Sequence, residues 1–367
     1  MKLLGRRTPL GLRSGLLGLG IIGGWTVARG TSQPLLLSAR DDAQGRHYAV
    51  GYELDGTQRF STRIKERCHD AYAHPYLPIA VFTGRRPSRE SYVVDLNTGE
   101  LLQTLHSPEH RHFYGHGIFD KDGQLFYTTE NDTRAPGRGV LGVYQVHERK
   151  LDRIAERSTH GIGPHQLLWM PDGEHLVVAN GGIRTEADSR EMMNLNAMDA
   201  SLVIMHHDGT LISRETLPQQ QNSIRHLAVA RDGTVVSGQQ YEGDAHDKAD
   251  LVAIKRPGQA FAPFPLADAQ RDLMQQYTAS VAIHDELRLL AITAPRGNRF
   301  FVWDLDTGHL RLDANVPDGA GVGAYAEGFV VTSGQGRCRL YDCTGSTPQM
   351  QALALPSGLW DNHLRLV

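Results

Sequence analysis

Short and almost continuously apolar runs recur along the chain, at intervals of about fifty residues. Each run ends in polar residues or glycine, as in IAVFTGRR and HLVVANGG. Runs of this kind are typical of strands buried on both faces, because a half-buried strand would alternate between apolar and polar positions. Seven copies are present, at residues 34–42, 79–86, 125–132, 175–182, 234–243, 289–297 and 329–336.

Two further elements repeat in a fixed order around these runs. A hairpin with Asp or Gly in its turn follows each run, at residues 52–64, 93–105, 143–155, 203–217, 251–266, 302–312 and 339–353. Another strand, which often ends at Asp-Gly, occurs at residues 67–75, 114–123, 163–173, 224–233, 278–286, 321–328 and 360–367. Asp-Gly and Asn-Thr-Gly supply the positive φ that such turns require.

These three elements predict an all-β fold, a seven-bladed β-propeller with four strands in each blade. The repeats begin with a second strand and a hairpin, and they end with an unpaired strand at residues 360–367. We therefore expect this last strand to pair with the N-terminal strands and complete the first blade, which leaves no exposed sheet edge. Residues 31–367 are expected to form this single propeller domain.

Residues 1–30 are expected to be an export signal, because they contain five basic residues and no acidic residue. Their glycine-rich apolar stretch, residues 15–28, is shorter than the roughly 20 residues of a membrane span. Arg6-Arg7 predicts the twin-arginine route, and an ordinary secretory signal is the alternative. Both predict a periplasmic protein that contacts the membrane only if the signal stays uncleaved.

Charge and cysteine content narrow the partners. The whole chain carries a formal charge of -3, and without the signal 33 basic residues face 41 acidic ones, a net of -8. An acidic protein of this kind is not expected to bind nucleic acid. Three cysteines, Cys68, Cys338 and Cys343, exclude a disulfide framework but leave one bridge between the last two open. Without a C-x-x-C-H motif, covalently attached haem is not expected.

Five histidines occupy matching positions in the strands that line the propeller channel: His69, His116, His165, His226 and His363. Histidine is the commonest metal ligand, so one interpretation is a site for copper or iron. Ligand nitrogens must come within about 2.1 Å of the ion, so three or four of the five rings can share it, but not all five. The alternative is a polar shaft in which the imidazoles hydrogen-bond one another and water.

Polar residues after the second strands are expected to lie in loops on the same face as the histidines. We predict that they form a ligand-binding mouth, and the alternative is a solvated rim. The candidates are Glu130, Asn131, Asn180, Arg184, Tyr241, Glu242 and Arg296. The longest such loop, residues 181–200, is long enough to cover the mouth. Its Met192, Met193 and Met198 are soft ligands that copper favours, or residues that pack the loop.

Several motifs resemble the bacterial family called domain of unknown function 1513: FYGHGIFDKDG, GPHQLLWMPDG, SIRHLAVARDG and WDNHL. The resemblance implies a periplasmic seven-bladed propeller, similar in shape to the quinoprotein amine dehydrogenase β-chain. It also implies an association with iron acquisition, with a partner of the imelysin or dihaem type. The family has no established reaction, so it assigns no catalytic residue. Cys68 departs from the pattern, since a glycine is expected beside His69.

Three kinds of function stay open, because a propeller is a scaffold that does not fix its function. A non-catalytic protein that binds a metal ion or metal complex for metal acquisition is favoured, since the sequence has no nucleophile motif. The alternative is a metal-dependent oxidoreductase or a lactonase-like hydrolase, with His116 or His165 as base beside Glu130 and Arg296. The third is a platform for protein partners on the opposite face.

Overall fold

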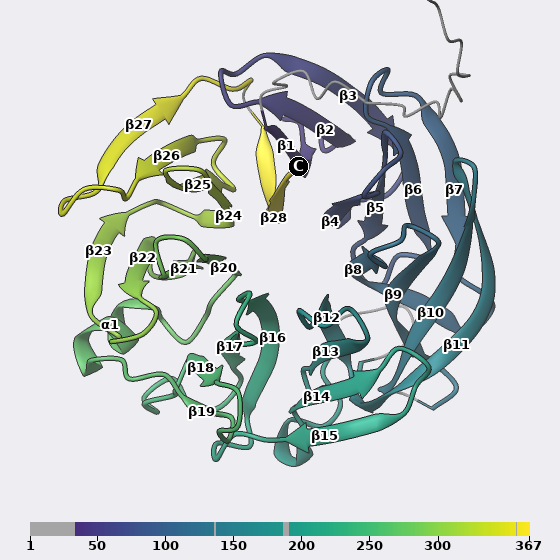
Figure 1. Ribbon diagram of the computed structural model, residues 1–367. Helices are drawn as coiled ribbons and strands as arrows, with labels where there is room; N and C mark the ends of the chain where they lie inside the picture. Colours follow the sequence, from purple (N-terminus) through teal and green to yellow (C-terminus); the bar gives the residue numbers. More distant parts are fainter. Residues whose placement is uncertain (1–33, 136, 186–190, 357) are drawn as a thin grey trace, which may run out of the picture. The chain divides into compact units, whose positions relative to one another are not determined.

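The computed structural model describes residues 34–135, 137–185, 191–356 and 358–367, so the predicted export signal lies outside the described residues. Within them, seven four-stranded antiparallel sheets are arranged around a central axis (Figure 1). The predicted all-β, seven-bladed propeller is confirmed. No helix of the described residues is long and apolar enough to cross a bilayer.

Each blade is a meander whose strands run from the axis to the rim in chain order, except in the blade that holds both ends. The innermost strands are β4 (Cys68–Ala73), β8 (Arg111–Phe119), β12 (Pro164–Trp169), β16 (Asn222–Val229), β20 (Ser280–His284), β24 (Gly319–Tyr325) and β28 (Leu359–Leu366). The second strands are β1 (Leu35–Asp41), β5 (Ile79–Gly84), β9 (Leu125–Asp132), β13 (His175–Asn180), β17 (Val235–Tyr241), β21 (Leu289–Ala294) and β25 (Gly328–Ser333).

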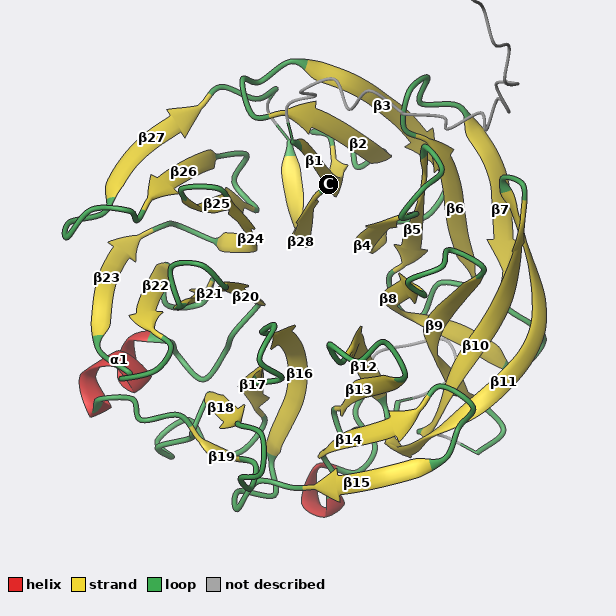
Figure 2. Ribbon diagram, viewed as in Figure 1, coloured by secondary structure: helices red, strands yellow, loops and turns green. Residues whose placement is uncertain are grey.

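The third and fourth strands form the outer hairpins (Figure 2). The third strands are β2 (His47–Glu53), β6 (Glu90–Asp95), β10 (Arg138–His147), β14 (Ser201–His206), β18 (Val252–Lys255), β22 (Arg299–Asp304) and β26 (Cys338–Asp342). The rim strands are β3 (Gln58–Ile64), β7 (Leu101–His106), β11 (Lys150–Ile162), β15 (Leu211–Glu215), β19 (Ala262–Pro263), β23 (Leu310–Asn315) and β27 (Gln349–Leu353). The connection between β13 and β14 holds η1 (Leu195–Ala197), and the connection between β19 and β20 holds α1 (Asp268–Leu273).

The ring closes through strand β28, as the order of the repeats predicts. It pairs antiparallel with β1, so that Leu36 lies opposite Leu366. Reciprocal backbone hydrogen bonds join Leu35 and Val367, with N–O distances of 2.9 and 3.1 Å. Every innermost strand contacts the next one around the axis, including β24 with β28 and β28 with β4. The first blade therefore has one strand from the C-terminal end and three from the N-terminal end.

The apolar core lies between neighbouring blades, because each blade presents an apolar face to the next. The second strands are buried along almost their whole length, and Val81, Val177 and Val236 have no exposed surface. Six apolar clusters follow one another around the ring, and the cluster at the closing blade joins β1 and β28 to β25 and β26. Burial on both faces explains why the second strands appear as continuous apolar runs in the sequence.

Trp360 tests the contribution of the closing strand to stability. Its side chain is 2% exposed, and its ring lies edge-on to Tyr52 with 5.7 Å between centroids. We expect Trp360→Ala to lower the free energy of unfolding by about 3–5 kcal/mol, because a large core side chain leaves a cavity. Urea unfolding followed by fluorescence or circular dichroism measures the loss.

Leu359→Ala is the matched control, since Leu359 begins the same strand but is 50% exposed. Its effect is expected to stay within about 0.5 kcal/mol. Equal losses in the two variants would contradict a closure that depends on core packing.

Candidate metal centre

The five predicted histidines lie in the innermost strands of five consecutive blades, and each sits at or beside a β-bulge. In each of the five blades, the regular pairing of the innermost strand with the second strand is interrupted at the histidine. The five positions are His69, His116, His165, His226 and His363. A bulge leaves an extra residue unpaired and turns side chains away from the normal alternation. The bulges therefore direct the histidines toward the channel axis.

Strand β16 shows this effect directly. Arg225 and His226 are adjacent in the chain, so in a regular strand their side chains would face opposite sides of the sheet. The register shifts between Ile224 and His226, and both Arg225 and His226 line the same pocket. The irregular pairing thus brings two neighbouring side chains to one side.

The five imidazoles form one compact cluster of buried rings. The five histidines are between 1% and 7% exposed. The ring centroids of neighbouring histidines are close, for example 4.6 Å apart for His69 and His363. Two triads have candidate ligand atoms within 4.8 Å of one another: His69, His116 and His165, and His116, His226 and His363. Around a tetrahedral ion, nitrogens bonded at about 2.05 Å lie about 3.3 Å apart. A triad would therefore need to contract by up to about 1.5 Å to hold an ion.

Several ring nitrogens of the cluster are buried without a hydrogen-bond partner in the described chain. They are Nε2 of His116, Nδ1 of His165, both nitrogens of His226, and Nε2 of His363. An unpaired buried nitrogen costs free energy, so native proteins usually satisfy such groups. A bound ion would supply the missing partner for several of them at once.

Two carboxylates orient the rings of the cluster from behind. His116 Nδ1 donates to Oδ2 of Asp70 at 2.9 Å, and His69 Nδ1 donates to Oδ1 of Asp361 at 2.7 Å. Each carboxylate belongs to the neighbouring blade, so these bonds also tie blades together. Donation from Nδ1 fixes the tautomer and leaves the Nε2 lone pair for a ligand, the arrangement common in metal-binding histidines.

The histidines are held neutral, as ligation requires. Burial lowers the pKa of His69 to about 4, even though the Asp361 carboxylate acts in the opposite direction. Burial also lowers the pKa of His116, and it lowers that of His165, His226 and His363 well below the ordinary value. At neutral pH the rings therefore offer lone pairs without first losing a proton.

The orienting carboxylates stay ionised because arginines face them. Arg365 donates to both oxygens of Asp70, at 3.1 and 2.7 Å, and its charge helps to hold the pKa of Asp70 below its usual range against the opposing effect of burial. Asp361 forms ion pairs with both Arg85 and Arg67. Against the opposing effect of burial, the charges of these two arginines help to lower the pKa of the Asp361 carboxyl. An ionised carboxylate behind a neutral ring raises the basicity of the ligand nitrogen.

Gly115 shows why the G-H-G motif needs a glycine beside the histidine. Its φ is 105°, a conformation that L side chains rarely adopt. A Cβ at this position would lie 2.6 Å from Cδ2 and 2.9 Å from Cβ of His69. The glycine thus allows the backbone of β8 to approach the His69 ring from the neighbouring blade.

A small pocket of about 90 Å³ opens onto the cluster. Three of the histidines form its floor, namely His69, His165 and His226. Arg85, Arg86 and Arg225 line it together with Tyr114, Gln240, Tyr277 and Asn362. The pocket is polar, and arginines and tyrosines form most of its wall, but none of the seven mouth residues predicted from the sequence lines it.

The other end of the channel is lined mostly by residues with apolar side chains, together with Arg365. Farther along the innermost strands, side chains such as Ile118, Leu227 and Val322 surround a hollow of about 340 Å³. Trp169 and Tyr72 also line it. The histidine cluster thus lies between one polar and one apolar opening.

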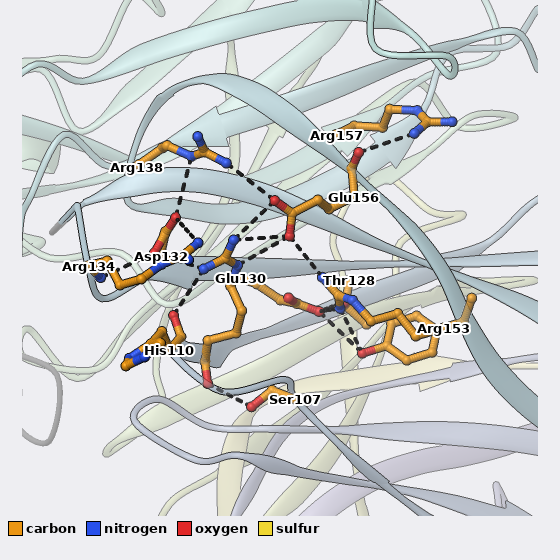
Figure 3. Close-up of polar contacts among 12 residues, drawn as sticks. Ser107, His110, Thr128, Glu130, Asp132, Arg134, Arg138, Arg153, Glu156 and Arg157 are labelled. Carbon is orange, nitrogen blue, oxygen red and sulfur yellow. Dashed lines mark hydrogen bonds and ion pairs between the residues drawn. The ribbon is translucent and has the colours of Figure 1, made fainter.

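Glu130 and Asn131 lie in strand β9 rather than in the predicted loop. The Glu130 carboxylate accepts hydrogen bonds from Arg153 at 2.6 Å and from Thr128 at 2.8 Å, within a network of charged side chains in this blade (Figure 3). Asn131 accepts a hydrogen bond from the backbone of Gly137. The structure does not bring these two side chains into the pocket, and a ligand-binding role for them stays a prediction.

Three other candidates also lie outside the pocket. Asn180 ends strand β13 and donates to the backbone of Thr159 at 3.2 Å. Arg184 is exposed. Tyr241 ends strand β17 and donates to Asp247 at 2.6 Å, which is the main cause that raises the pKa of Tyr241 to about 12.

Glu242 and Arg296 do touch residues of the pocket wall. Glu242 lies 3.5 Å from Arg225, and the Arg296 guanidinium lies 4.5 Å from the centre of the Tyr277 ring. These two are therefore the predicted mouth residues that the structure brings closest to the histidines.

None of these methionines and cysteines lines the pocket at the histidines. Met198 is buried, whereas Met192 and Met193 are 38% and 49% exposed. Cys68 packs in an apolar cluster, where burial raises the pKa of its thiol well above the usual value. Cys338 and Cys343 are free thiols, so the bridge between them that the sequence left open is not formed.

Sequence reasoning missed the residues that support the histidines. Asp70 follows His69 directly, Asp361 lies two residues before His363, and Arg225 precedes His226. Arg85 and Arg86 directly follow β5, the second strand of their blade. The sequence signal that could have found them is the recurrence of Asp and Arg within two residues of the aligned histidines. Only the β-bulges in the structure show that the side chains of such neighbours can reach the same side of the sheet as the histidines.

Comparison with known proteins agrees with this architecture. Residues 62–367 match the family described as protein of unknown function (DUF1513). The chain belongs to this family. No curated protein matches its sequence.

Similar solved structures show the same fold at low sequence identity. Hydrazine synthase of Kuenenia stuttgartiensis matches with a TM-score of 0.59 and 13% identity, over 86% of this chain and 95% of that one. A putative 6-phosphogluconolactonase from Bacteroides uniformis matches with a TM-score of 0.63 and 11% identity, over 91% and 99%. The propeller domain of Myceliophteria thermophila Cps50 (Swd1) gives 0.56 and 9%, over 88% and 98%. At these identities the likeness shows the fold alone.

The buried histidines predict a pH dependence of stability in the metal-free protein. Their pKa values are lower in the folded chain than the roughly 6.5 of the unfolded chain, so the unfolded chain binds more protons below that pH. Stability is therefore expected to fall as the pH drops from about 6.5 toward 4, by about 1.4 kcal/mol per pH unit for each such histidine. Urea unfolding with a chelator at several pH values measures this slope.

His226→Asn is expected to reduce this slope by the contribution of one histidine, since neither nitrogen of His226 has a partner to lose. The exposed His246 provides the control, and His246→Asn should leave the slope unchanged. Parallel pH profiles for the wild type and His226→Asn would contradict a buried, neutral cluster.

Gly115→Ala is predicted to disturb the cluster from the backbone. The substitution strains a positive φ and also forces the new methyl group into His69, so the loss of stability should exceed that of a strained φ alone by about 1–3 kcal/mol. Gly45→Ala is the matched control, because Gly45 has a φ of 71° and no atom within 4 Å of the added carbon. Thermal unfolding of both variants gives the comparison, and equal losses would contradict the contact.

Proposed function

We propose that this propeller is a non-catalytic metal-binding protein that holds a divalent transition-metal ion among its channel histidines. The observation that carries the proposal is the convergence of five buried, neutral histidines from five blades, with ring nitrogens that lack hydrogen-bond partners. Imidazole suits copper, iron, zinc and nickel, and either triad supplies three ligands. The Asp70 and Asp361 carboxylates would orient two of these rings.

The alternative of a polar shaft joined by ring-to-ring hydrogen bonds has less support. Neutral imidazoles could satisfy one another in pairs, since each has one donor and one acceptor. Among the described residues, however, no hydrogen bond joins two of the five rings, although their centroids lie as close as 4.6 Å. Close rings with unpaired nitrogens favour a shared ion over such a network.

We further propose copper or iron as the ion and the periplasm as the location. The basic N-terminal segment with Arg6-Arg7 supports export, and the twin-arginine route suits a protein that folds and binds its ion before transport. The resemblance of the motifs to their family supports a role in iron acquisition, with an imelysin-type or dihaem protein as partner. Cell fractionation and elemental analysis of the exported protein from its own host test these points together.

A metal-dependent enzyme is the second candidate, and the pocket beside the histidines favours it. A catalytic metal keeps one coordination position open to substrate, and His69, His165 and His226 all face the pocket. The two functions differ in turnover: an enzyme would convert a substrate, such as a lactone, in a metal-dependent reaction. A binding protein would not.

His116→Asn tests the metal site, because His116 is the ligand common to both triads. After treatment with a chelator, the wild type is expected to take up one equivalent of Cu(II) or Fe(II), measured by elemental analysis and calorimetry. Outer-shell partners alone change metal affinity by about 10–100-fold, so loss of this ligand should cost at least about 100-fold. Metal at about 100 times its dissociation constant should also stabilise the wild type by about 2.7 kcal/mol.

The exposed His246 again supplies the matched control, and His246→Asn should bind metal as the wild type does. Circular dichroism and thermal unfolding of the metal-free variants establish that both are folded. Failure of the wild type to bind any of Cu(II), Fe(II) or Zn(II), or unchanged affinity in His116→Asn, would overturn the proposed function.

A further inference from the structure

A pair of partly exposed histidines lies outside the channel, in the blade that also contains His165. His175 begins strand β13 and His206 ends strand β14, and the antiparallel register places them directly opposite each other. Directly opposed residues of an antiparallel pair have side chains on the same face, close enough to interact. The turn before His175 follows the end of β12, whereas His165 lies near the beginning of β12, so the pair lies at the end of the blade away from the channel histidines.

The propeller fold does not require histidines at these two places. The other six blades have an apolar residue or glycine at the start of the second strand: Leu35, Ile79, Leu125, Val235, Leu289 and Gly328. The residues opposite them in the third strand are Glu53, Asp95, Gln145, Lys255, Asp304 and Asp342. None of these six pairs contains a histidine. The histidine pair is therefore a particular feature of one blade.

Asp172 holds the His175 ring in a defined orientation. Its Oδ1 accepts hydrogen bonds from the backbone nitrogens of Glu174 and His175, at 2.8 and 2.9 Å, which fixes the carboxylate within the turn. Its Oδ2 then accepts a hydrogen bond from His175 Nδ1 at 2.8 Å. A carboxylate on Nδ1 keeps the proton there and leaves the Nε2 lone pair for a metal ion.

The His206 ring is also engaged with its own turn through Nδ1. This nitrogen lies 3.0 Å from Oδ1 of Asp208 and 3.4 Å from the Asp208 backbone nitrogen. Asp208 is fixed in turn by a hydrogen bond from the backbone nitrogen of Thr210 at 2.8 Å. In both rings, Nε2 is therefore the nitrogen that is left for a ligand.

The separation of the two rings suits a shared ion. An ion bonded to two imidazole nitrogens at about 2.05 Å, with a tetrahedral angle between them, places the ring centroids about 5.2 Å apart. The centroids of His175 and His206 are 5.7 Å apart, and their planes are inclined at 72°. Both side chains are about 30% exposed, so small rotations at the surface can close the remaining difference.

We propose that His175 and His206 bind a divalent transition-metal ion, such as Cu(II), Ni(II) or Zn(II), at a second site that is separate from the channel cluster. Imidazole is a ligand that all three ions accept, and Cu(II) binds most tightly in the usual order of affinities. His207 lies beside the pair, with its ring centroid 4.3 Å from that of His206. Two protein ligands leave the remaining coordination positions to water, so this site is weaker than a three-histidine site and exchanges its ion readily.

The test is a calorimetric titration of the chelator-treated wild type with Cu(II) at pH 7. We expect one equivalent that binds more weakly than the channel ion, and we expect both His175→Gln and His206→Gln to lower its affinity at least about tenfold, because loss of an outer-shell partner alone costs about 10–100-fold. The matched control is His309→Asn, since His309 is an exposed histidine in the outer turn of another blade. It should leave this equivalent unchanged.

Asp172→Asn tests whether the carboxylate positions the His175 ring. Asparagine can keep the backbone hydrogen bonds through Oδ1, but its amide nitrogen would donate to His175 Nδ1 and move the ring proton to Nε2, where it blocks the ligand position. We expect Cu(II) affinity at the surface site to fall about 10–100-fold, with an unchanged thermal unfolding midpoint of the metal-free protein. Unchanged affinity would show that Asp172 does not orient a ligand.

The outcomes separate this inference from the proposed function, because the two sites share no residue. Cu(II) binding that both glutamine variants weaken, in a protein whose affinity does not depend on His116, would support the surface site and count against the channel site. Cu(II) binding that depends on His116 but is the same in His175→Gln, His206→Gln and the wild type would overturn the surface site and leave the channel site standing.

Discussion

The pairing of β28 with β1 closes the propeller and also assembles the histidine cluster. Strand β28 contributes Trp360 to the core, Asp361 to the His69 ring, His363 to a triad and Arg365 to Asp70. Asp70 in turn orients His116, which lies in the following blade. One strand therefore sets the rings of two other blades, and the cluster has its correct geometry only when the ring is closed.

Burial creates the chemistry of the cluster and also its cost. Removal from water keeps the imidazoles neutral, as metal ligation would require, but several of their nitrogens have no hydrogen-bond partner among the described residues. The orienting carboxylates escape protonation because Arg365, Arg67 and Arg85 surround them. Arg67 also lies 3.5 Å from Asp41, so three carboxylates face these three arginines. A cation would therefore be favoured by the lone pairs of the neutral rings, with balanced ion pairs behind them.

The sequence predicts the blades well, because three kinds of element recur in the same order. The innermost strand, the second strand and the outer hairpin each have their own pattern of apolar and polar residues, which reflects how deeply each is buried. It also predicts the five histidines, since they occupy equivalent places in equivalent strands. It does not predict which polar residues accompany them. Glu130 and Arg225 are both polar residues in the strands nearest the channel. The Glu130 side chain nevertheless binds Arg153 within its own blade, whereas the Arg225 side chain lines the pocket. The side to which a residue turns depends on strand alternation and on the bulges, and no sequence motif marks a bulge.

The difference between the two channel ends gives the site a direction. At one end an ion would meet a hollow lined mostly by apolar side chains, such as Ile118 and Leu227, and at the other end the polar pocket. The pocket reaches His69, His165 and His226, whereas His363 does not line it and belongs to the second triad. His116 is common to both triads, so an ion can exchange the other two ligands while it keeps this one. Such a cluster has more histidines than one ion would use. A new bond between the ion and a histidine could therefore form before an old one breaks, which would favour loading and release of the ion over its permanent retention.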